Sequence, residues 1–251
     1  MRKIAIYGKG GIGKSTTCAN IAVALAEKGY KVMQIGCDPK ADSTYALRHG
    51  SELGTVLDVF RRKQNDFELD EIVKIGHAGV VCVEAGGPIP GVGCAGRGII
   101  TALEKLEAKG AYEKFQPDVI IYDVLGDVVC GGFSMPMRDG YADEVYIVTS
   151  GENMSIYAAA NIAVAIDNFK ERGYAKLGGL ILNRRDVKRE DEKVQELCED
   201  LGTEVVGDIP RSEVVTEAEE MKMTVLEAFP ESEQAEVYRK LASRIIEGNR
   251  D

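Results

Sequence analysis

The sequence has no C-x-x-C pair among its six cysteines, no apolar run long enough to cross a bilayer and no hydrophobic run of signal-peptide length near Met1. The missing pair excludes a thioredoxin-type redox site and a zinc ribbon. Only Ile4–Tyr7 separate the basic start of the chain from a glycine-rich segment, so we expect no signal peptide, no membrane contact and a cytoplasmic location. Basic charge is also in deficit, since 31 Lys and Arg oppose 41 Asp and Glu. The resulting net charge of -10 argues against nucleic acid as a partner.

Internal repeats and linker-like segments are absent too, so we expect a single domain over residues 1–251. Short β-rich runs alternate with helical stretches, which is typical of an α/β fold with a doubly wound, mostly parallel sheet. The predicted strands are Lys3–Tyr7, Lys31–Ile35, Val80–Glu84, Val119–Tyr122, Glu144–Thr149, Leu177–Asn183 and Glu204–Val206. The predicted helices are about Lys14–Lys28, Ile99–Lys109, Ser155–Arg172 and Ser232–Glu247.

The last predicted helix is amphipathic, with Val237, Leu241 and Ile245 on one stripe. A membrane-surface helix is one interpretation. Its acidic and basic residues balance, however, and leave no positive face for lipid. We therefore expect the stripe to pack on the core.

GKGGIGKST matches the phosphate-loop pattern G-x-x-x-x-G-K-[ST] between a predicted strand and a predicted helix. Backbone N–H groups of such a loop cradle phosphates, Lys14 is expected at the β/γ-phosphates, and Ser15 is expected on Mg²⁺. Lys9 makes this a deviant Walker A, a pattern of ATPases that hold nucleotide between two subunits; an ordinary exposed lysine is the alternative. The loop residues are Gly8, Lys9, Gly10, Gly11, Ile12, Gly13, Lys14, Ser15 and Thr16.

Acidic residues follow two predicted strands. DVIIYD ends in Asp123, our Walker B candidate near Mg²⁺, whereas Asp118 is interpreted as a strand-start residue. GCDPKADST offers Asp38 and Asp42, which can position water or respond to the γ-phosphate. A turn or helix-cap role is the alternative for these two acids.

Two cysteines lie among glycines, Cys94 in GVGCAGRG and Cys130 in GDVVCGGF. Glycines let the backbone approach a bulky cluster, and a [4Fe-4S] cluster normally takes four thiolates. Two ligands per chain become four across the two-fold axis of a homodimer. Apolar or helical surroundings favour simple packing for Cys18, Cys82 and Cys198, and Cys37 on the acidic loop stays open.

Asp123 and Cys130 share the short segment DVLGDVVC. A shift of this segment at the γ-phosphate can therefore alter the surroundings of the cluster. Asp127 lies between them and is interpreted either as orienting the attacking water or as capping the turn.

Five motifs stand along the chain in this order: GKGGIGKST, GCDPKADST, CVEAGGPIPGVGCAGRG, YDVLGDVVCGGF and LGGLILN. On these motifs the chain from Ile4 to about Gly248 resembles the nitrogenase iron protein family. Related ATP-dependent reductases of dark protochlorophyllide reduction and of nickel-tetrapyrrole synthesis share these motifs. The resemblance implies an ATP-dependent one-electron donor with MgATP and one [4Fe-4S] cluster per homodimer. It also implies a nitrogenase-like catalytic partner and a ferredoxin or flavodoxin as upstream donor.

Individual roles follow from the same resemblance. Cys94 and Cys130 would bind the cluster, and Asn183 would contact adenine. Pro210 and Arg211 would form the loop near the base. Arg97 matches a surface arginine that docks the partner and is ADP-ribosylated in some members; an ordinary exposed arginine is the alternative. Nucleotide binding, hydrolysis and switching would fall to Lys9, Lys14, Ser15, Asp38, Asp42, Asp123 and Asp127.

Two departures bear on the partner. The sequence ends soon after its last predicted helix, without the C-terminal segment of many nitrogenase iron proteins, and Ser212 replaces their frequent Asp. The final substrate therefore stays open. Two other classes are alternatives. A Par/Min partitioning ATPase acts on DNA or membrane, which the acidic net charge and the glycine-flanked cysteines oppose, and an iron–sulfur scaffold ATPase typically carries a C-x-x-C that this sequence lacks.

Overall fold

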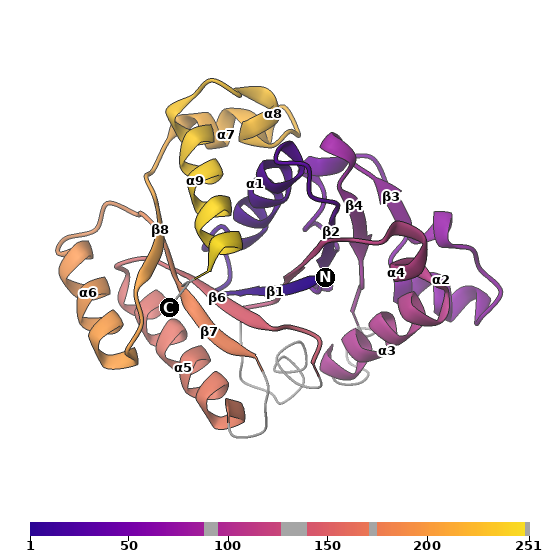
Figure 1. Cartoon of the computed structure of the whole chain (residues 1–251), viewed down its shortest axis with the longest axis horizontal. Helices are drawn as coiled ribbons and strands as arrows, with labels where there is room; N and C mark the ends of the chain where they lie inside the picture. Colours follow the sequence, from indigo (N-terminus) through magenta and orange to yellow (C-terminus); the bar gives the residue numbers. More distant parts are fainter. Residues whose placement is uncertain (88–94, 127–139, 171–174, 249–251) are drawn as a thin grey trace.

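A computed structural model describes residues 1–87, 95–126, 140–170 and 175–248. In these ranges eight strands form one sheet in the order β3-β4-β2-β5-β1-β6-β7-β8 (Figure 1). Every strand pair is parallel except β3 with β4. The strands are β1 Arg2–Tyr7, β2 Val32–Gly36, β3 Val73–Ile75, β4 Val81–Glu84, β5 Val119–Asp123, β6 Glu144–Thr149, β7 Lys176–Asn183 and β8 Val205–Ile209.

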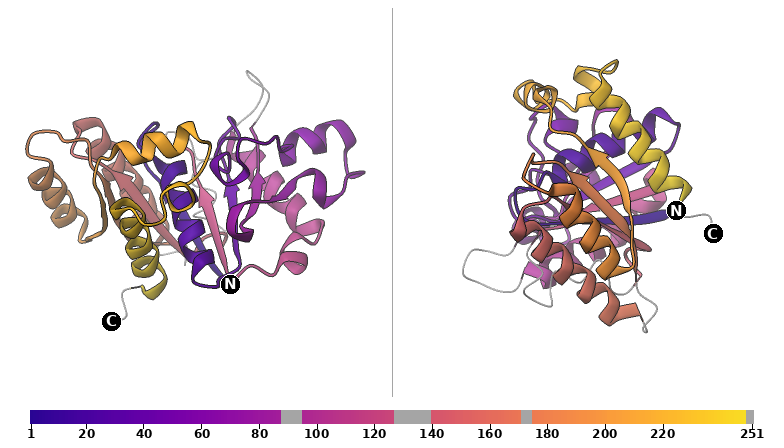
Figure 2. Two further views of the ribbon diagram at one scale, coloured as in Figure 1. Left: turned by 90° about the horizontal axis from the view of Figure 1, so that it is seen from above. Right: turned by 90° about the vertical axis from the view of Figure 1, so that its left-hand side faces the viewer.

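Helices cover both faces of this sheet, and each face has its own hydrophobic core (Figures 1 and 2). One face carries α1 Lys14–Glu27, α7 Glu213–Glu220, α8 Val225–Ala228 and α9 Glu233–Glu247. The other carries α2 Val56–Lys63, α3 Ala95–Ala108, α4 Ala111–Phe115, α5 Asn153–Lys170 and α6 Glu190–Leu201. Strands covered on both faces are continuously apolar, and the predicted doubly wound α/β class is confirmed.

Every predicted strand and helix is present, with ends shifted by a few residues at most. Gly29 and Gly110 follow α1 and α3 with φ of +90° and +72°, the left-handed geometry that glycine adopts freely. Leu241 and Ile245 of α9 are buried and Val237 packs beside them, so the expected core packing of this helix is confirmed. The antiparallel edge strand β3 was not predicted.

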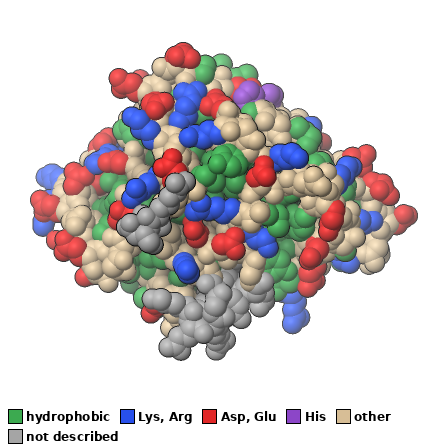
Figure 3. All heavy atoms as spheres, viewed as in Figure 1, with side chains coloured by type: hydrophobic (Ala, Val, Ile, Leu, Met, Phe, Trp, Pro, Cys, Tyr) green, Lys and Arg blue, Asp and Glu red, His purple; other side chains and the backbone are tan. Residues whose placement is uncertain are grey.

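Three short 3-10 turns complete the described elements: η1 Ala46–Arg48, η2 Leu69–Glu71 and η3 His77–Gly79. Acidic and basic side chains are interspersed over the face shown in Figure 3. Among the described helices, none is both long enough and apolar enough to traverse a bilayer.

Candidate functional site: a phosphate loop between buried acids

The phosphate loop joins β1 to α1 at the carboxyl edge of the sheet. Gly8, Gly11 and Gly13 have φ of +147°, +75° and +97°, which side chains with a Cβ rarely adopt. A Cβ on Gly13 would also lie 2.6 Å from Nδ2 of Asn183. The first N–H groups of a helix lack intrahelical partners, so the start of α1 at Lys14 is suited to an anion.

Hydrogen bonds from two directions fix the carbonyl groups of the loop. The buried Lys14 donates from Nζ to the Lys9 carbonyl oxygen at 3.2 Å. Asn183, which ends β7, donates from Nδ2 to the Ile12 carbonyl at 2.6 Å, and Arg185 donates to the Gly11 carbonyl at 3.0 Å. Side chains from three positions therefore hold the shape of the loop, and a loop held in one shape lowers the entropy cost of binding.

Asp123 ends β5 directly beneath the loop and is 3% exposed. Burial raises the pKa of its carboxyl group, whereas hydrogen bonds from the hydroxyls of Ser15 and Ser43 and the charge of Lys14 lower it. A carboxylate and a serine hydroxyl are oxygen ligands of the kind that Mg²⁺ and its waters take. The donor set here therefore fits the MgATP chemistry expected of Ser15 and Asp123.

Two further candidate acids, Asp38 and Asp42, lie on the loop after β2. Asp38 accepts a hydrogen bond from the Lys40 backbone N–H at 2.9 Å, so the turn role is present, and its charge raises the pKa of Asp123. Asp42 is exposed and lines a cavity of about 310 Å³ together with Ser15 and Thr16. Asp123 and Asp42 thus lie beside residues at the start of α1, and Asp38 is near enough to act on Asp123.

A second cavity of about 310 Å³ opens beside the phosphate loop. Its lining includes Gly11 and Gly13 from the loop together with Asn183, Pro210 and Arg211. The residues expected around the base are therefore brought together at the loop.

Gly126 brings the chain after β5 against the phosphate loop. A Cβ at this position would lie 2.1 Å from the Gly8 carbonyl oxygen and 2.7 Å from the Gly10 nitrogen. Only glycine allows two backbones to approach so closely. The chain that leaves β5 is thus in direct contact with the phosphate loop at Gly126.

Sequence reasoning missed a second buried acid, Glu84 at the end of β4. Its Oε1 accepts hydrogen bonds from the Thr44 backbone N–H at 2.7 Å and the Thr44 hydroxyl at 2.6 Å. Arg48 lies 3.7 Å from the same oxygen, and both side chains are almost fully buried. Burial raises the pKa of Glu84 to about 7. An acid that ends an apolar run was also the signal used for Asp123, and it was available here in CVEAGG.

The remaining candidates divide by position. Cys94, Asp127 and Cys130 lie outside the described residues, and Arg97 is exposed on the first turn of α3. The four cysteines that the structure describes are all buried, and burial raises the pKa of each thiol, which opposes the thiolate form that cluster ligation needs. These four are Cys18, Cys37, Cys82 and Cys198.

Solved structures with the same fold include nucleotide-dependent ATPases. The cell division ATPase MinD of Pyrococcus furiosus is 22% identical with a TM-score of 0.75, and 98% of each chain is covered. A ParA family ATPase from Chlorobium tepidum is 21% identical with a TM-score of 0.73, over 96% of this chain and 97% of that one. At such identities the likeness establishes the fold and leaves the activity open.

Sequence comparison is more specific. A nitrogenase iron protein from Methanococcus voltae is 52% identical over 251 residues, which cover 100% of this chain and 90% of that protein. The model of the 4Fe-4S iron–sulfur cluster binding proteins of the NifH/frxC family matches residues 2–251. The chain therefore belongs to the NifH/frxC family of iron–sulfur proteins, whose cofactors are a [4Fe-4S] cluster and MgATP.

Proposed function

We propose that this protein is an ATP-dependent one-electron donor to a nitrogenase or nitrogenase-like catalytic partner. Family membership over residues 2–251 supports a reductase of this type. The observation that carries the mechanism is the close approach of Gly126 to Gly8 and Gly10, because Cys130 follows Gly126 closely in the sequence. Movement of the loop on binding or losing a γ-phosphate would displace the segment from Gly126 to Cys130.

In this proposal residues 1–251 form one P-loop ATPase domain that works as a homodimer. Cys94 and Cys130 of each copy would hold one shared [4Fe-4S] cluster; the burial of the four described cysteines supports this choice of ligands. When bound, the cluster supplies a one-electron redox centre whose potential depends on charge, hydrogen bonding and solvent exposure.

The roles that we assign in nucleotide binding and hydrolysis follow from where each residue lies around the phosphate loop. Lys14 and Ser15 would bind the phosphates and Mg²⁺, with Asp123 holding the water shell of the ion. Asp38, Asp42 and Asp127 would orient water and respond to hydrolysis, while Asn183, Pro210 and Arg211 would surround the base. The shared cavity of these last three residues with Gly11 and Gly13 supports that role.

Lys9 would reach the phosphates of the partner subunit across the dimer. A Lys9→Ala variant whose ATP hydrolysis and nucleotide-dependent compaction in solution scattering matched the wild type would contradict this role. Arg97, exposed on α3, would dock the catalytic partner. A ferredoxin or flavodoxin would reduce the cluster.

The experiment that tests the mechanism measures removal of cluster iron by a chelator under anaerobic conditions. We expect MgATP to accelerate removal relative to nucleotide-free protein. A coupling of about 1–3 kcal/mol corresponds to a change of roughly 5- to 150-fold, which is readily measured. Equal rates in protein shown to bind MgATP would leave the two sites unconnected.

The ligand assignment has its own control in the same assay. Iron per dimer should be lost in Cys94→Ala and Cys130→Ala and kept in Cys37→Ala. Loss of the cluster from Cys37→Ala but not from Cys94→Ala would contradict the assignment.

A further inference from the structure

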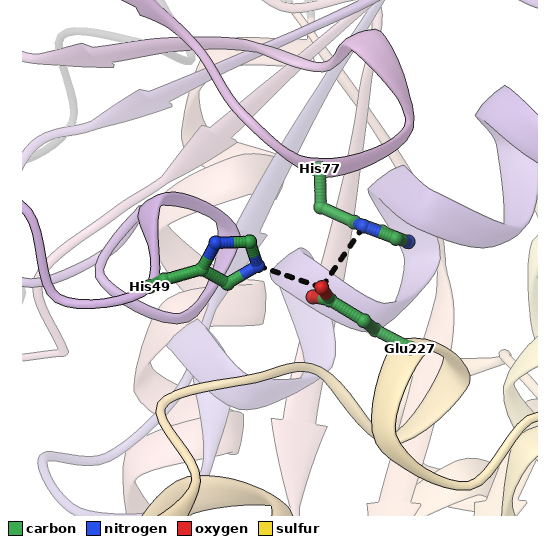
Figure 4. A group of neighbouring side chains, drawn as sticks. All are labelled: His49, His77 and Glu227. Atoms are coloured by element: carbon green, nitrogen blue, oxygen red, sulfur yellow. Dashed lines mark hydrogen bonds and ion pairs between the residues drawn. The ribbon is translucent and has the colours of Figure 1, made fainter.

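The two histidines of this chain meet at one carboxylate, far from the phosphate loop in sequence. Nε2 of His49 lies 2.6 Å from Oε1 of Glu227, and Nδ1 of His77 lies 3.1 Å from the same oxygen (Figure 4). The three ligand atoms all lie within 4.8 Å of one another. A histidine is visible at the rim of the face shown in Figure 3.

Three separate segments position these side chains. His49 follows η1 with φ of +51°, His77 opens η3, and Glu227 lies in α8. The α8 helix is itself fixed, because the Thr224 hydroxyl accepts from the Glu227 backbone N–H at 3.3 Å. The convergence is thus a product of tertiary structure and not of neighbouring positions in the chain.

The donor set is that of a transition-metal site. Two imidazole nitrogens and one carboxylate oxygen are ligands that Zn²⁺ takes, with a water in the fourth position. The side chains of His49 and His77 are 50% and 33% exposed, which gives an ion a path to the site, whereas that of Glu227 is 13% exposed. Two neutral imidazoles and one carboxylate carry a single negative charge, which favours a cation.

The two histidines can satisfy only one of the two oxygens of the Glu227 carboxylate by hydrogen bonding. Two neutral imidazoles can both donate N–H to Oε1 of Glu227. Oε2 of Glu227 is buried and has no hydrogen-bond partner among the described residues, a costly state for a charged oxygen. A cation at the carboxylate would supply the interaction that this oxygen lacks.

We propose that His49, His77 and Glu227 bind one divalent transition-metal ion of the Zn²⁺ class. The ion would cross-link three segments, two of which contribute Ala46 and Val225 to the cavity that Ser15 also lines. The segment before His49 is bound to Glu84 through Thr44, and α8 is bound to α1 because Val225 N–H donates to Oδ1 of Asn20 at 2.8 Å. Binding is therefore expected to raise thermal stability, since a ligand that binds only the folded state stabilises it.

Equilibrium dialysis against low-micromolar Zn²⁺ tests the proposal. The full chain is used with its cluster in place, so that the cluster ligands do not bind zinc, and without nucleotide, which chelates metal. Zinc is counted by mass spectrometry and the melting temperature is measured with and without it. We expect about one Zn²⁺ per chain and a zinc-dependent rise in melting temperature.

Single substitutions His49→Gln, His77→Gln and Glu227→Gln should each weaken zinc binding by at least about tenfold and remove the thermal shift. Glu231→Gln, at an exposed carboxylate just after α8, is the matched control and should behave as wild type. If one variant fails to fold, the other two still decide. No zinc bound by the wild type, or undiminished binding by the folded variants, would overturn the proposal and leave a hydrogen-bonded cluster only.

Discussion

Asp123 and Glu84 end the two strands that flank β2, and both pair in register with Gly36. Each carboxylate holds the loop that follows β2, Asp123 through the Ser43 hydroxyl and Glu84 through Thr44. Only Asp123 also reaches Ser15 of the phosphate loop, whereas Glu84 faces the buried Arg48. Similar acids at equivalent strand ends thus differ in their second partner: Asp123 reaches Ser15 of the phosphate loop, where we propose that it acts on MgATP, and Glu84 reaches Arg48.

The largest expected effect comes from Asp123→Asn. Removing the charge beside Ser15 should slow ATP hydrolysis by about 10²- to 10³-fold, or roughly 3–4 kcal/mol, and weaken the acceleration of iron chelation by MgATP. Iron content should stay unchanged, because Asp123 is not a proposed cluster ligand. Asp118→Asn is the control, because the Asp118 carboxylate accepts from the Lys31 backbone N–H at the opposite end of the same strand. Wild-type hydrolysis in Asp123→Asn would contradict the comparison.

Of the two buried acids, Asp123 could be predicted from the sequence because the residues that point to its role stand in short continuous motifs. Loop glycines, Lys14 and Ser15 stand in one run, and Asp123 ends an apolar strand beside a recognised motif. Glu84 carries the same strand-end signal, but its partners Thr44 and Arg48 are distant in sequence and become visible only in the fold. The strand β3 has the sequence Val-Lys-Ile, and three residues are too few for their alternation of apolar and polar side chains to stand out as a strand.

The histidine cluster marks the limit of such reasoning. His49, His77 and Glu227 come from three segments with no shared periodicity, and no local pattern unites them. Cys94 and Cys130 are also distant in the sequence, and both lie outside the described residues, so the shared cluster site stays a prediction.

The next effect concerns the pH dependence of stability. Burial raises the pKa of Glu84 from 4.5 to about 7, so the folded protein holds this proton more tightly than the unfolded chain. The contribution of Glu84 to stability is therefore fully present below 4.5 and is lost as pH rises through about 7. The total change is roughly 3 kcal/mol.

Denaturant unfolding of wild type and Glu84→Gln between about pH 5.5 and pH 8 checks this linkage. The stability of the wild type relative to the variant should fall as pH rises. Glu71→Gln serves as control, because hydrogen bonds to Lys63 and the Glu68 backbone lower the pKa of Glu71 and its titration lies below this window. A difference that does not change with pH would remove the distinction between the two acids.

A smaller loss of stability is expected from Gly126→Ala. This residue follows Asp123 and lies against the phosphate loop, so the change leaves the surroundings of Glu84 untouched. The added methyl group would meet the Gly8 carbonyl at 2.1 Å, so one backbone must shift, at a cost of about 1–3 kcal/mol in the free energy of unfolding. Gly10→Ala is the matched control without nucleotide, because nothing lies within 4 Å of its added Cβ. Equal stability of the two variants would show that the contact does not constrain the loop.

The smallest effects should separate the two acids through adjacent residues. Thr44→Val removes the hydroxyl that donates to Glu84 at 2.6 Å and accepts from Arg48 at 2.9 Å, so stability should fall by about 1–2 kcal/mol with hydrolysis nearly unchanged. Ser43→Ala removes the hydroxyl that donates to Asp123 and accepts from Nε2 of Gln34 at 2.9 Å, but the same Gln34 amide keeps its bond to the Ser43 carbonyl at 2.9 Å. This variant should therefore lose hydrolysis by a few-fold with a stability change below about 1 kcal/mol. Unfolding curves and ATPase rates on both variants decide the matter, and the opposite pattern would assign the chemistry to Glu84.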